Sequence, residues 1–227
     1  MYIREDCWLK NKCNHIDCKS SLCRRLYMTD KFYANAFMSD KNKTDIVLTV
    51  NDDSVDIPVF DSLSSIQKHI VEFVDAGNNI YMYSKNTGNG KTSWAIKLLQ
   101  EYIDKIWYKT SKECPVLFIN VPRYLLAIKD NITDKNDYVQ HIKENVLDCD
   151  IVVWDDIGTK AATSFEHETL LSIIDTRNSN GKTNIYTSNL NGLELFNFVG
   201  ERLYSRIYNN SFPYVFEFKE KDARRVV

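Results

Sequence analysis

The sequence has few glycines and prolines, no long apolar run and no excess of charge of one sign. Its 227 residues include seven Gly and four Pro, too few for a collagen-like or low-complexity chain. No apolar stretch approaches the roughly 18 residues that a membrane span needs, so we expect no membrane partner. The 29 Lys and Arg against 31 Asp and Glu give a net charge of -2, and any contact with nucleic acid must therefore be local.

The N-terminus also lacks the unbroken apolar stretch of a secretory signal peptide, because Arg4, Glu5 and Asp6 interrupt it. We therefore expect a cytoplasmic protein, and structural disulfides are rare in a reducing compartment. The chain length fits one compact α/β domain with a small appendage.

Cysteine is unevenly distributed along the chain. Four of the six cysteines fall in the first 23 residues, where an even distribution would place fewer than one. Thiolates cluster in a reducing compartment mainly to bind a metal, so these four are candidate zinc ligands, with His15 as an alternate. They are Cys7, Cys13, Cys18 and Cys23. The spacing contains no C-x-x-C pair, and free thiols are the alternative interpretation.

Strand and helix patterns alternate through most of the chain. Short apolar runs predict strands at residues 79–84, 116–121, 150–155, 183–188 and 214–218. Apolar residues at helical spacing predict helices at 61–76 and near 91–108, 136–148, 165–178 and 200–208. Strands that are apolar throughout and alternate with helices predict an α/β fold, a parallel sheet flanked by helices on both faces.

Composition divides the chain into three parts. Residues 1–38 form a Cys-rich segment that ends in apolar and aromatic positions, and the polar stretch that follows begins a linker at 39–60. The main domain is predicted to cover residues 61–227.

A glycine-containing loop follows the first strand of this domain. It reads Lys85-Asn86-Thr87-Gly88-Asn89-Gly90-Lys91-Thr92 and continues through Ser93 into an amphipathic helix. Gly88 and Gly90 allow backbone N–H groups to turn toward an anion. Lys91 can reach the β- and γ-phosphates of a nucleotide, and the Thr92 hydroxyl can bind Mg²⁺. The loop departs from the pattern G-x-x-x-x-G-K-[ST] where Lys85 replaces the first glycine.

Two carboxylates end the strand at 150–155. Asp155 and Asp156 are expected at the carboxyl edge of the sheet, where ligands bind in open α/β folds. Asp155 would hold Mg²⁺ through water, and Asp156 occupies the position of a general base that orients the attacking water. Because Asp is one methylene shorter than Glu, hydrolysis is expected to be slow. A solvated acidic turn is the alternative interpretation.

Further polar residues follow the later strands. Asn189 comes directly after the strand at 183–188 and is expected near the γ-phosphate, although an Asn there can also form a turn. Arg202 and Arg206 share one face of the last predicted helix, where one could act as an arginine finger or both could be solvated. Arg224 and Arg225 read, by themselves, as part of a basic tail.

These residues together resemble the DnaC-like replicative helicase loaders of the AAA+ class, the DnaI and IstB types included, especially the short versions of phages and prophages of Gram-positive bacteria. The resemblance covers nearly the whole chain and is carried by NIYMYSKNTGNGKTSWAIKLL, DIVVWDDIG, NIYTSNL, GERLYSRI and DARR, in that order. It implies a five-stranded parallel AAA+ core. It also implies Asn189 as sensor 1, Arg206 as a finger acting in trans, and Arg224 as a sensor 2 candidate, with Arg225 as the alternative.

The function that this resemblance implies is ATP-dependent helicase loading in the bacterial host cytoplasm. Such a protein is an ATPase that uses ATP and Mg²⁺ and assembles into a ring or spiral. It binds the replicative DNA helicase and delivers it to single-stranded DNA. Its Cys-rich N-terminal segment would contact the helicase. Two alternatives share the motifs: an IstB-like ATPase helper for transposition, and a nucleotide-gated adaptor with little turnover.

Overall fold

A parallel sheet forms the centre of the protein. The computed structural model describes Cys7, Leu9 and residues 23–43, 46–130, 136–159 and 163–220. The five strands are β1 (Ile80–Tyr83), β2 (Val116–Asn120), β3 (Ile151–Asp155), β4 (Thr183–Ser188) and β5 (Val215–Glu217). Their order is β2-β3-β4-β1-β5, and all four pairings are parallel. The predicted α/β class with a five-stranded parallel sheet is confirmed.

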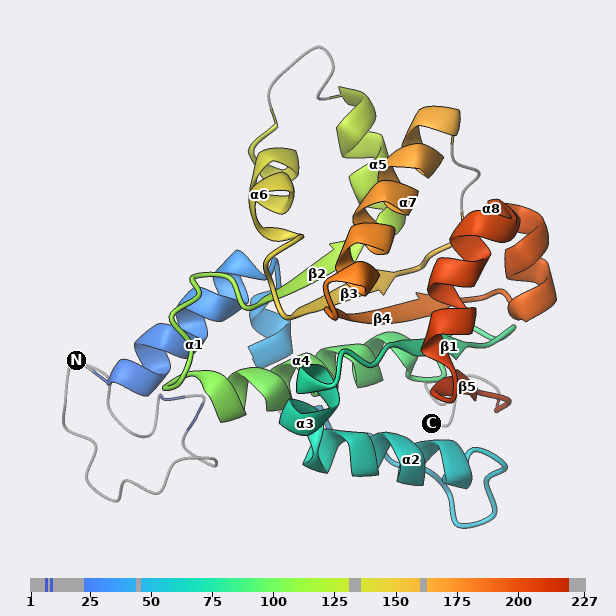
Figure 1. The fold of residues 1–227 in the computed structure, drawn as a ribbon. Helices are drawn as coiled ribbons and strands as arrows, with labels where there is room; N and C mark the ends of the chain where they lie inside the picture. Colours follow the sequence, from blue (N-terminus) through green and yellow to red (C-terminus); the bar gives the residue numbers. More distant parts are fainter. Residues whose placement is uncertain are drawn as a thin grey trace.

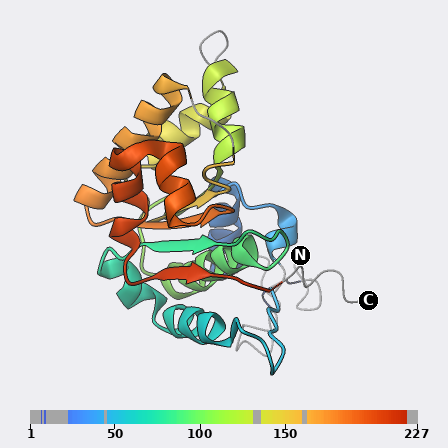
Figure 2. The same cartoon turned by 90° about the vertical axis from the view of Figure 1, so that its right-hand side faces the viewer.

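Helices cover both faces of this sheet (Figure 1). One face packs against α1 (Arg24–Asn35), α2 (Ile57–Lys68), α3 (Ile70–Asp75) and α4 (Lys91–Ile106). The other packs against α5 (Val121–Asp130), α6 (Asp137–Asn145), α7 (Ser164–Ser179) and α8 (Gly192–Ile207). The described residues also form two short 3-10 turns, η2 (Asp40–Lys43) and η3 (Asn209–Ser211). Figure 2, turned toward the β5 edge, shows the sheet between these two layers. In the described part of the chain, no helix is both long and apolar enough to cross a bilayer.

Residues along each strand alternate between two hydrophobic cores. On β1, Ile80 and Met82 belong to the core with α1–α4, whereas Tyr81 belongs to the core with α5–α8. On β3, Val153 packs into the first core and Trp154 into the second. Because both faces are buried, neither face of a strand needs polar residues, which explains the continuous apolar runs in the sequence.

The helices differ from the sequence prediction in three places. The helix expected at 61–76 is two helices, because His69 has non-helical angles (φ -111°, ψ 32°). α5 begins directly after β2, with Pro122 at a position where a helix needs no N–H donor. α8 begins at Gly192 instead of near 200, because Asn191 and Glu194 form a capping box, and Gly200 then kinks it (φ 75°, ψ 165°).

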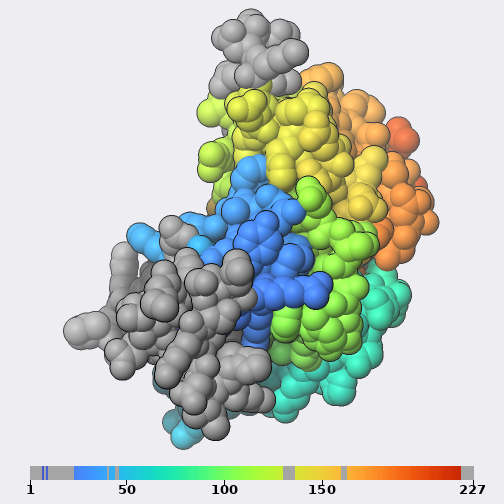
Figure 3. All heavy atoms as spheres, turned by 90° about the vertical axis from the view of Figure 1, so that its left-hand side faces the viewer, coloured from blue at the N-terminus to red at the C-terminus, as the bar shows by residue number. Residues whose placement is uncertain are grey.

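α1 packs against the sheet and contributes to the first core. Phe32, Tyr33 and Ala36 are buried there with residues of α4. The Ala36 carbonyl accepts the N–H of Phe118 at 2.9 Å and so covers the free edge of β2. From this side, the blue atoms of α1 lie against the green atoms of α4 (Figure 3). The division into segments 1–38, 39–60 and 61–227 stays a prediction, and α1 shares its core with the third of them.

A buried arginine ties together the beginnings of β3 and β4. The fully buried Arg177 donates to Asn184 Oδ1 at 2.8 Å, to the Thr183 carbonyl at 2.6 Å and to the Cys149 carbonyl at 3.0 Å. These three acceptors are neutral oxygens, two at the start of β4 and one just before β3. These bonds fix the relative position of the two strands whose opposite ends carry the acidic pair and Asn189.

Candidate nucleotide-binding site

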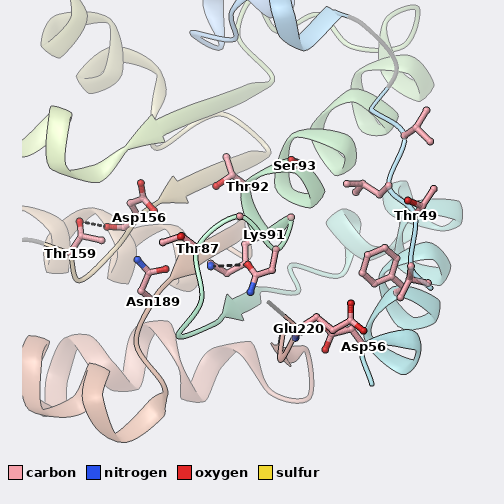
Figure 4. A pocket seen from close by; sticks show the side chains of 17 residues that line it. Thr49, Asp56, Thr87, Lys91, Thr92, Ser93, Asp156, Thr159, Asn189 and Glu220 are labelled. Atoms are coloured by element: carbon pink, nitrogen blue, oxygen red, sulfur yellow. Dashed lines mark hydrogen bonds between the residues drawn. The ribbon is translucent and has the colours of Figure 1, made fainter. Parts of the chain in front are cut away.

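A cavity of about 630 Å³ lies at the carboxyl edge of the sheet (Figure 4). Its wall comes from five parts of the chain: the loop after β1 with the start of α4, the end of β3, the end of β4, the segment that leads into the first turn of α2, and the chain after β5. The lining residues are Thr87–Ser93, Asp156, Thr159, Asn189, Val47–Val50, Asp56, Phe60 and Glu220. The fold thus brings the loop, Asp156 and Asn189, which the sequence singled out, to one cavity.

The loop after β1 has the backbone conformation that its glycines allow. Gly88 has φ 81° and Gly90 has φ 93°, values that strain residues carrying a Cβ. Gly90 is the N-cap of α4, a 16-residue helix whose first N–H groups have no acceptor within the helix. The loop folds back onto β1, because Ser84 Oγ accepts the Asn86 N–H at 3.1 Å and also the Asn89 side-chain amide. A helix N-terminus at the end of such a loop suits an anion.

Lys91 is a buried cation beside the cavity. It is only 7% exposed, and its Nζ donates to Asn89 Oδ1 at 3.1 Å and to the Asn86 carbonyl at 3.3 Å. Burial lowers its pKa, while the charges of Asp156 and Asp155 oppose that shift. A buried ammonium group whose hydrogen bonds go to neutral oxygens gains from an anionic partner, and the phosphates of a nucleotide supply one.

Lys85, which replaces the first glycine of the loop pattern, lies outside this cavity lining. Its side chain is largely exposed, and its Nζ is 3.8 Å from Glu194 Oε1 in the first turn of α8. The first residue of the loop thus forms an ion pair with α8, whereas Lys91 is the loop lysine that lines the cavity. A phosphate-binding role for Lys85 stays a prediction.

The end of β3 presents an oxygen-rich group that fits Mg²⁺. The Thr92 hydroxyl donates to Asp155 Oδ1 at 2.8 Å, and the Thr187 hydroxyl donates to the same oxygen, also at 2.8 Å. Asn120 at the end of β2 approaches Asp155 Oδ2 at 3.4 Å. Hydroxyl and carboxylate oxygens next to a phosphate-binding loop are the ligands that Mg²⁺ takes in such sites, so Thr92 and Asp155 fit the predicted metal site.

Asp156 adopts an unusual backbone conformation directly after β3. Its φ is 59°, its N–H donates to Thr187 Oγ1 at 3.0 Å, and its carbonyl accepts the Thr159 hydroxyl at 2.9 Å. Burial, and then the charge of Asp155, raises the pKa of Asp156, while Lys91 and Asn120 oppose this shift. A carboxylate with a raised pKa at the cavity wall is suited to accept a proton.

Among the other predicted catalytic residues that the structure describes, Asn189 lines the cavity and Arg206 is not among its lining residues. Asn189 follows β4 and lines the cavity. Arg206 is on α8, where its Nε pairs with Asp175 of α7, and both side chains are about half exposed. Arg224 and Arg225 lie outside the described residues. The sensor and finger roles of these residues stay predictions.

The zinc prediction falls largely on residues that the structure does not describe. Cys13, His15 and Cys18 are among these, whereas Cys7 and Cys23 are described as free thiols. Within the described ranges, no group of three or more His, Cys, Asp or Glu side chains could hold a metal ion. Zinc binding therefore stays a prediction.

Several residues of this site were not predicted from the sequence, among them four with polar side chains. Asn120 and Thr187 contact Asp155, and Asp56 and Glu220 line the cavity. Asn120 had a usable signal, because it ends a strand and the carboxyl ends of parallel strands meet at one edge. Asp56 and Glu220 had none, since they reach the cavity from outside the strand and loop patterns.

Comparisons with known proteins find similarity to proteins of DNA replication. No family model matches the sequence. The replicative helicase loader DnaC of Escherichia coli K12 is 24% identical over 164 residues, which cover 72% of this chain and 64% of that relative. A crystal structure of the DnaC helicase loader matches with a TM-score of 0.61 and 19% identity, over 75% of this chain and 94% of the other. The replication initiator DnaA bound to AMPPCP and single-stranded DNA matches with a TM-score of 0.59 and 17% identity, over 77% and 49%.

The chain thus spans less than two thirds of the length of the curated relative that it matches. The solved structures establish the fold, and the curated relative adds similarity in sequence over 72% of this chain. The chain is thus similar in sequence to the DnaC helicase loader, and it shares the fold of the DnaC and DnaA structures.

Proposed function

We propose that the chain binds ATP with Mg²⁺ at this cavity and hydrolyses it. Lys91 and the N-terminus of α4 would bind the phosphates, and Thr92 and Asp155 would hold the metal ion. When bound, Mg²⁺ neutralises phosphate charge. Asp156 would orient the attacking water and accept its proton, and Asn189 would contact the γ-phosphate. The observation that carries this proposal is the meeting of Lys91, Thr92, Asp155 and Asp156 beside one cavity.

We further propose that this nucleotide cycle serves the loading of a replicative DNA helicase onto single-stranded DNA. The similarity in sequence to DnaC covers 72% of the chain, and the DnaC crystal structure matches the fold over 75% of it. The Cys-rich N-terminal segment, with or without zinc, would contact the helicase in the cytoplasm of the host. Arg206 would reach the nucleotide of a neighbouring subunit in a ring or spiral, because a finger in trans needs an exposed arginine, and Arg206 is about half exposed.

The test is complex formation with the replicative helicase of the same organism. Both proteins are purified, mixed with MgATP, MgADP or a non-hydrolysable ATP analogue, and followed by size-exclusion chromatography with light scattering. A complex that forms with the analogue and dissociates after hydrolysis supports loading. The Lys91→Ala variant should lose this nucleotide dependence, because it loses the buried cation of the loop.

Two results would redirect the proposal. Separate elution of loader and helicase in every nucleotide state rejects helicase loading. Stable binding to the helicase with no phosphate release, even with single-stranded DNA present, rejects the hydrolysis step and leaves the nucleotide-gated adaptor.

A further inference from the structure

Asp56 occupies the N-cap position of α2 but does not cap that helix. An Asp at this position usually accepts an N–H from the first turn of its own helix. Here the structure records no side-chain cap bond from Asp56. Its carboxylate instead accepts two backbone N–H groups from the C-terminal chain, Lys219 at 2.9 Å through Oδ1 and Glu220 at 3.1 Å through Oδ2.

These partly buried contacts lie at the wall of the nucleotide cavity. Asp56 is only 3% exposed, and both Asp56 and Glu220 line the cavity, where Figure 4 shows them side by side. A buried carboxylate needs strong partners, and two amide donors together with the N-terminus of the 12-residue helix α2 provide them. The carboxylate therefore attaches the chain after β5 firmly to the cavity.

The phosphate-binding loop binds the same two residues through their carbonyl groups. The Asn86 side-chain amide donates to the carbonyls of Lys219 and Glu220, each at 3.3 Å. The Asn86 carbonyl in turn accepts from Lys91 Nζ. Lys91 would direct its ammonium group toward a bound phosphate, because a charge-assisted bond to an anion is the stronger one. Nucleotide binding therefore acts on the residue that joins the loop to the C-terminal chain.

We propose that Asp56 is a positioning residue that fixes the C-terminal chain at Lys219 and Glu220, and that Asn86 couples this position to nucleotide binding. This inference rests on the proposed nucleotide function. Coupling is reciprocal: if nucleotide stabilises the attached chain, the attached chain raises nucleotide affinity by the same factor. Arg224 and Arg225 follow these two residues in the sequence.

The test measures amide hydrogen exchange residue by residue by NMR, with and without a non-hydrolysable MgATP analogue. In the wild type, the analogue should slow exchange both in the loop at 86–92 and at the amides of Lys219 and Glu220. In Asp56→Ala, these two amides should exchange at least about tenfold faster without nucleotide, and the analogue should no longer slow them. Loop protection should persist, with the Kd for ATP raised about tenfold.

Three further variants make the test specific. Asp53→Ala removes an exposed carboxylate from the same segment and should behave as wild type. Asp56→Asn keeps one acceptor oxygen and should give an intermediate effect on both exchange and Kd. Asn86→Ala should separate the two readouts: the amides of Lys219 and Glu220 stay slow in exchange, but the analogue no longer changes them.

Two outcomes overturn the inference. If the analogue protects the loop in the wild type and leaves Lys219 and Glu220 unchanged, the coupling does not exist. If Asp56→Ala and Asp53→Ala exchange alike at these amides, Asp56 does not hold the chain. A wild type whose loop is not protected refutes the proposed nucleotide function and the coupling together, and the comparison without nucleotide still decides the role of Asp56.

Discussion

Thr187 Oγ1 lies 2.8 Å from Asp155 Oδ1 and donates its proton to that carboxylate. The Thr187 hydroxyl oxygen also accepts the N–H of Asp156 at 3.0 Å. One fully buried hydroxyl on β4 thus orients the carboxylate of one acidic residue and fixes the backbone of the next. The two strands are neighbours in the sheet, so the acidic pair of β3 depends on a side chain of β4 for its geometry.

We expect Thr187→Val to damage both stability and hydrolysis. The shape of the side chain is kept, but the Asp156 N–H loses its acceptor and Asp155 loses a donor, which costs about 1–3 kcal/mol for a buried group. Hydrolysis should fall about 10–100-fold because the acidic pair shifts. Denaturant unfolding and steady-state phosphate release measure the two effects. Thr187→Ser, which keeps the hydroxyl, should restore most of both, and a wild-type rate for Thr187→Val would contradict the positioning role.

Lys91→Ala should lower ATP affinity about 100-fold or more, because charge-assisted bonds to two phosphates are lost. Its melting temperature should not fall, since the buried ammonium carries a desolvation cost. Fluorescence titration with a labelled ATP analogue measures the affinity. The matched control is Lys85→Ala: this exposed lysine faces Glu194, so its loss should change affinity less than about threefold. Equal losses in both variants would place Lys85 at the phosphates as well.

Asp156→Asn should retain ATP binding and lose hydrolysis by about 100-fold or more, the contribution typical of a general base. Because the pKa of Asp156 is raised in the folded state, hydrolysis in the wild type should fall with acidity at a pH above the range of an ordinary Asp. Phosphate release across a pH series, with binding checked at each pH, measures this limb.

The same shift predicts a pH-dependent stability difference. A raised folded-state pKa means that the folded protein binds this proton more tightly, so the stabilisation is present at low pH and lost as pH rises through the folded pKa. Asp156→Asn should therefore be at least as stable as wild type at neutral pH, and its relative advantage should shrink in acid. A variant that is markedly less stable at neutral pH would contradict this assignment.

Arg206→Ala should leave the fold and monomeric ATP binding intact, because its ion pair with Asp175 is about half exposed and contributes about 1 kcal/mol at most. Assembled protein should lose hydrolysis about 10³-fold if the arginine acts across a subunit boundary. Mixing Arg206→Ala with Lys91→Ala subunits should restore part of the activity, since intact sites form between them. Asp175→Asn, which keeps the guanidinium, should remain active, and full activity of assembled Arg206→Ala would refute the finger.

The loop and the acidic pair could be predicted because their chemistry is local in sequence. Gly88, Gly90, Lys91 and Thr92 must follow one another to surround a phosphate, and Asp155 must end a buried strand, so a short stretch of sequence carries each signal. The strands could be predicted for a related reason: burial on both faces leaves continuous apolar runs. Helix α5 and the first half of α8 were missed, because α5 begins with no loop after β2 and Gly200 interrupts the helical pattern of α8.

By itself, the sequence determined the elements and the chemical groups of the site. The tertiary structure decided which of those groups meet. Thr187 reaches Asp155 only because β4 pairs with β3, and no local pattern encodes that order. Asp56 reaches Lys219 across 163 residues, because β5 pairs with β1 and directs the chain toward the start of α2. Contacts between distant segments depend on how the buried faces pack together, and the hydrophobic periodicity of a single segment contains no information about its partner.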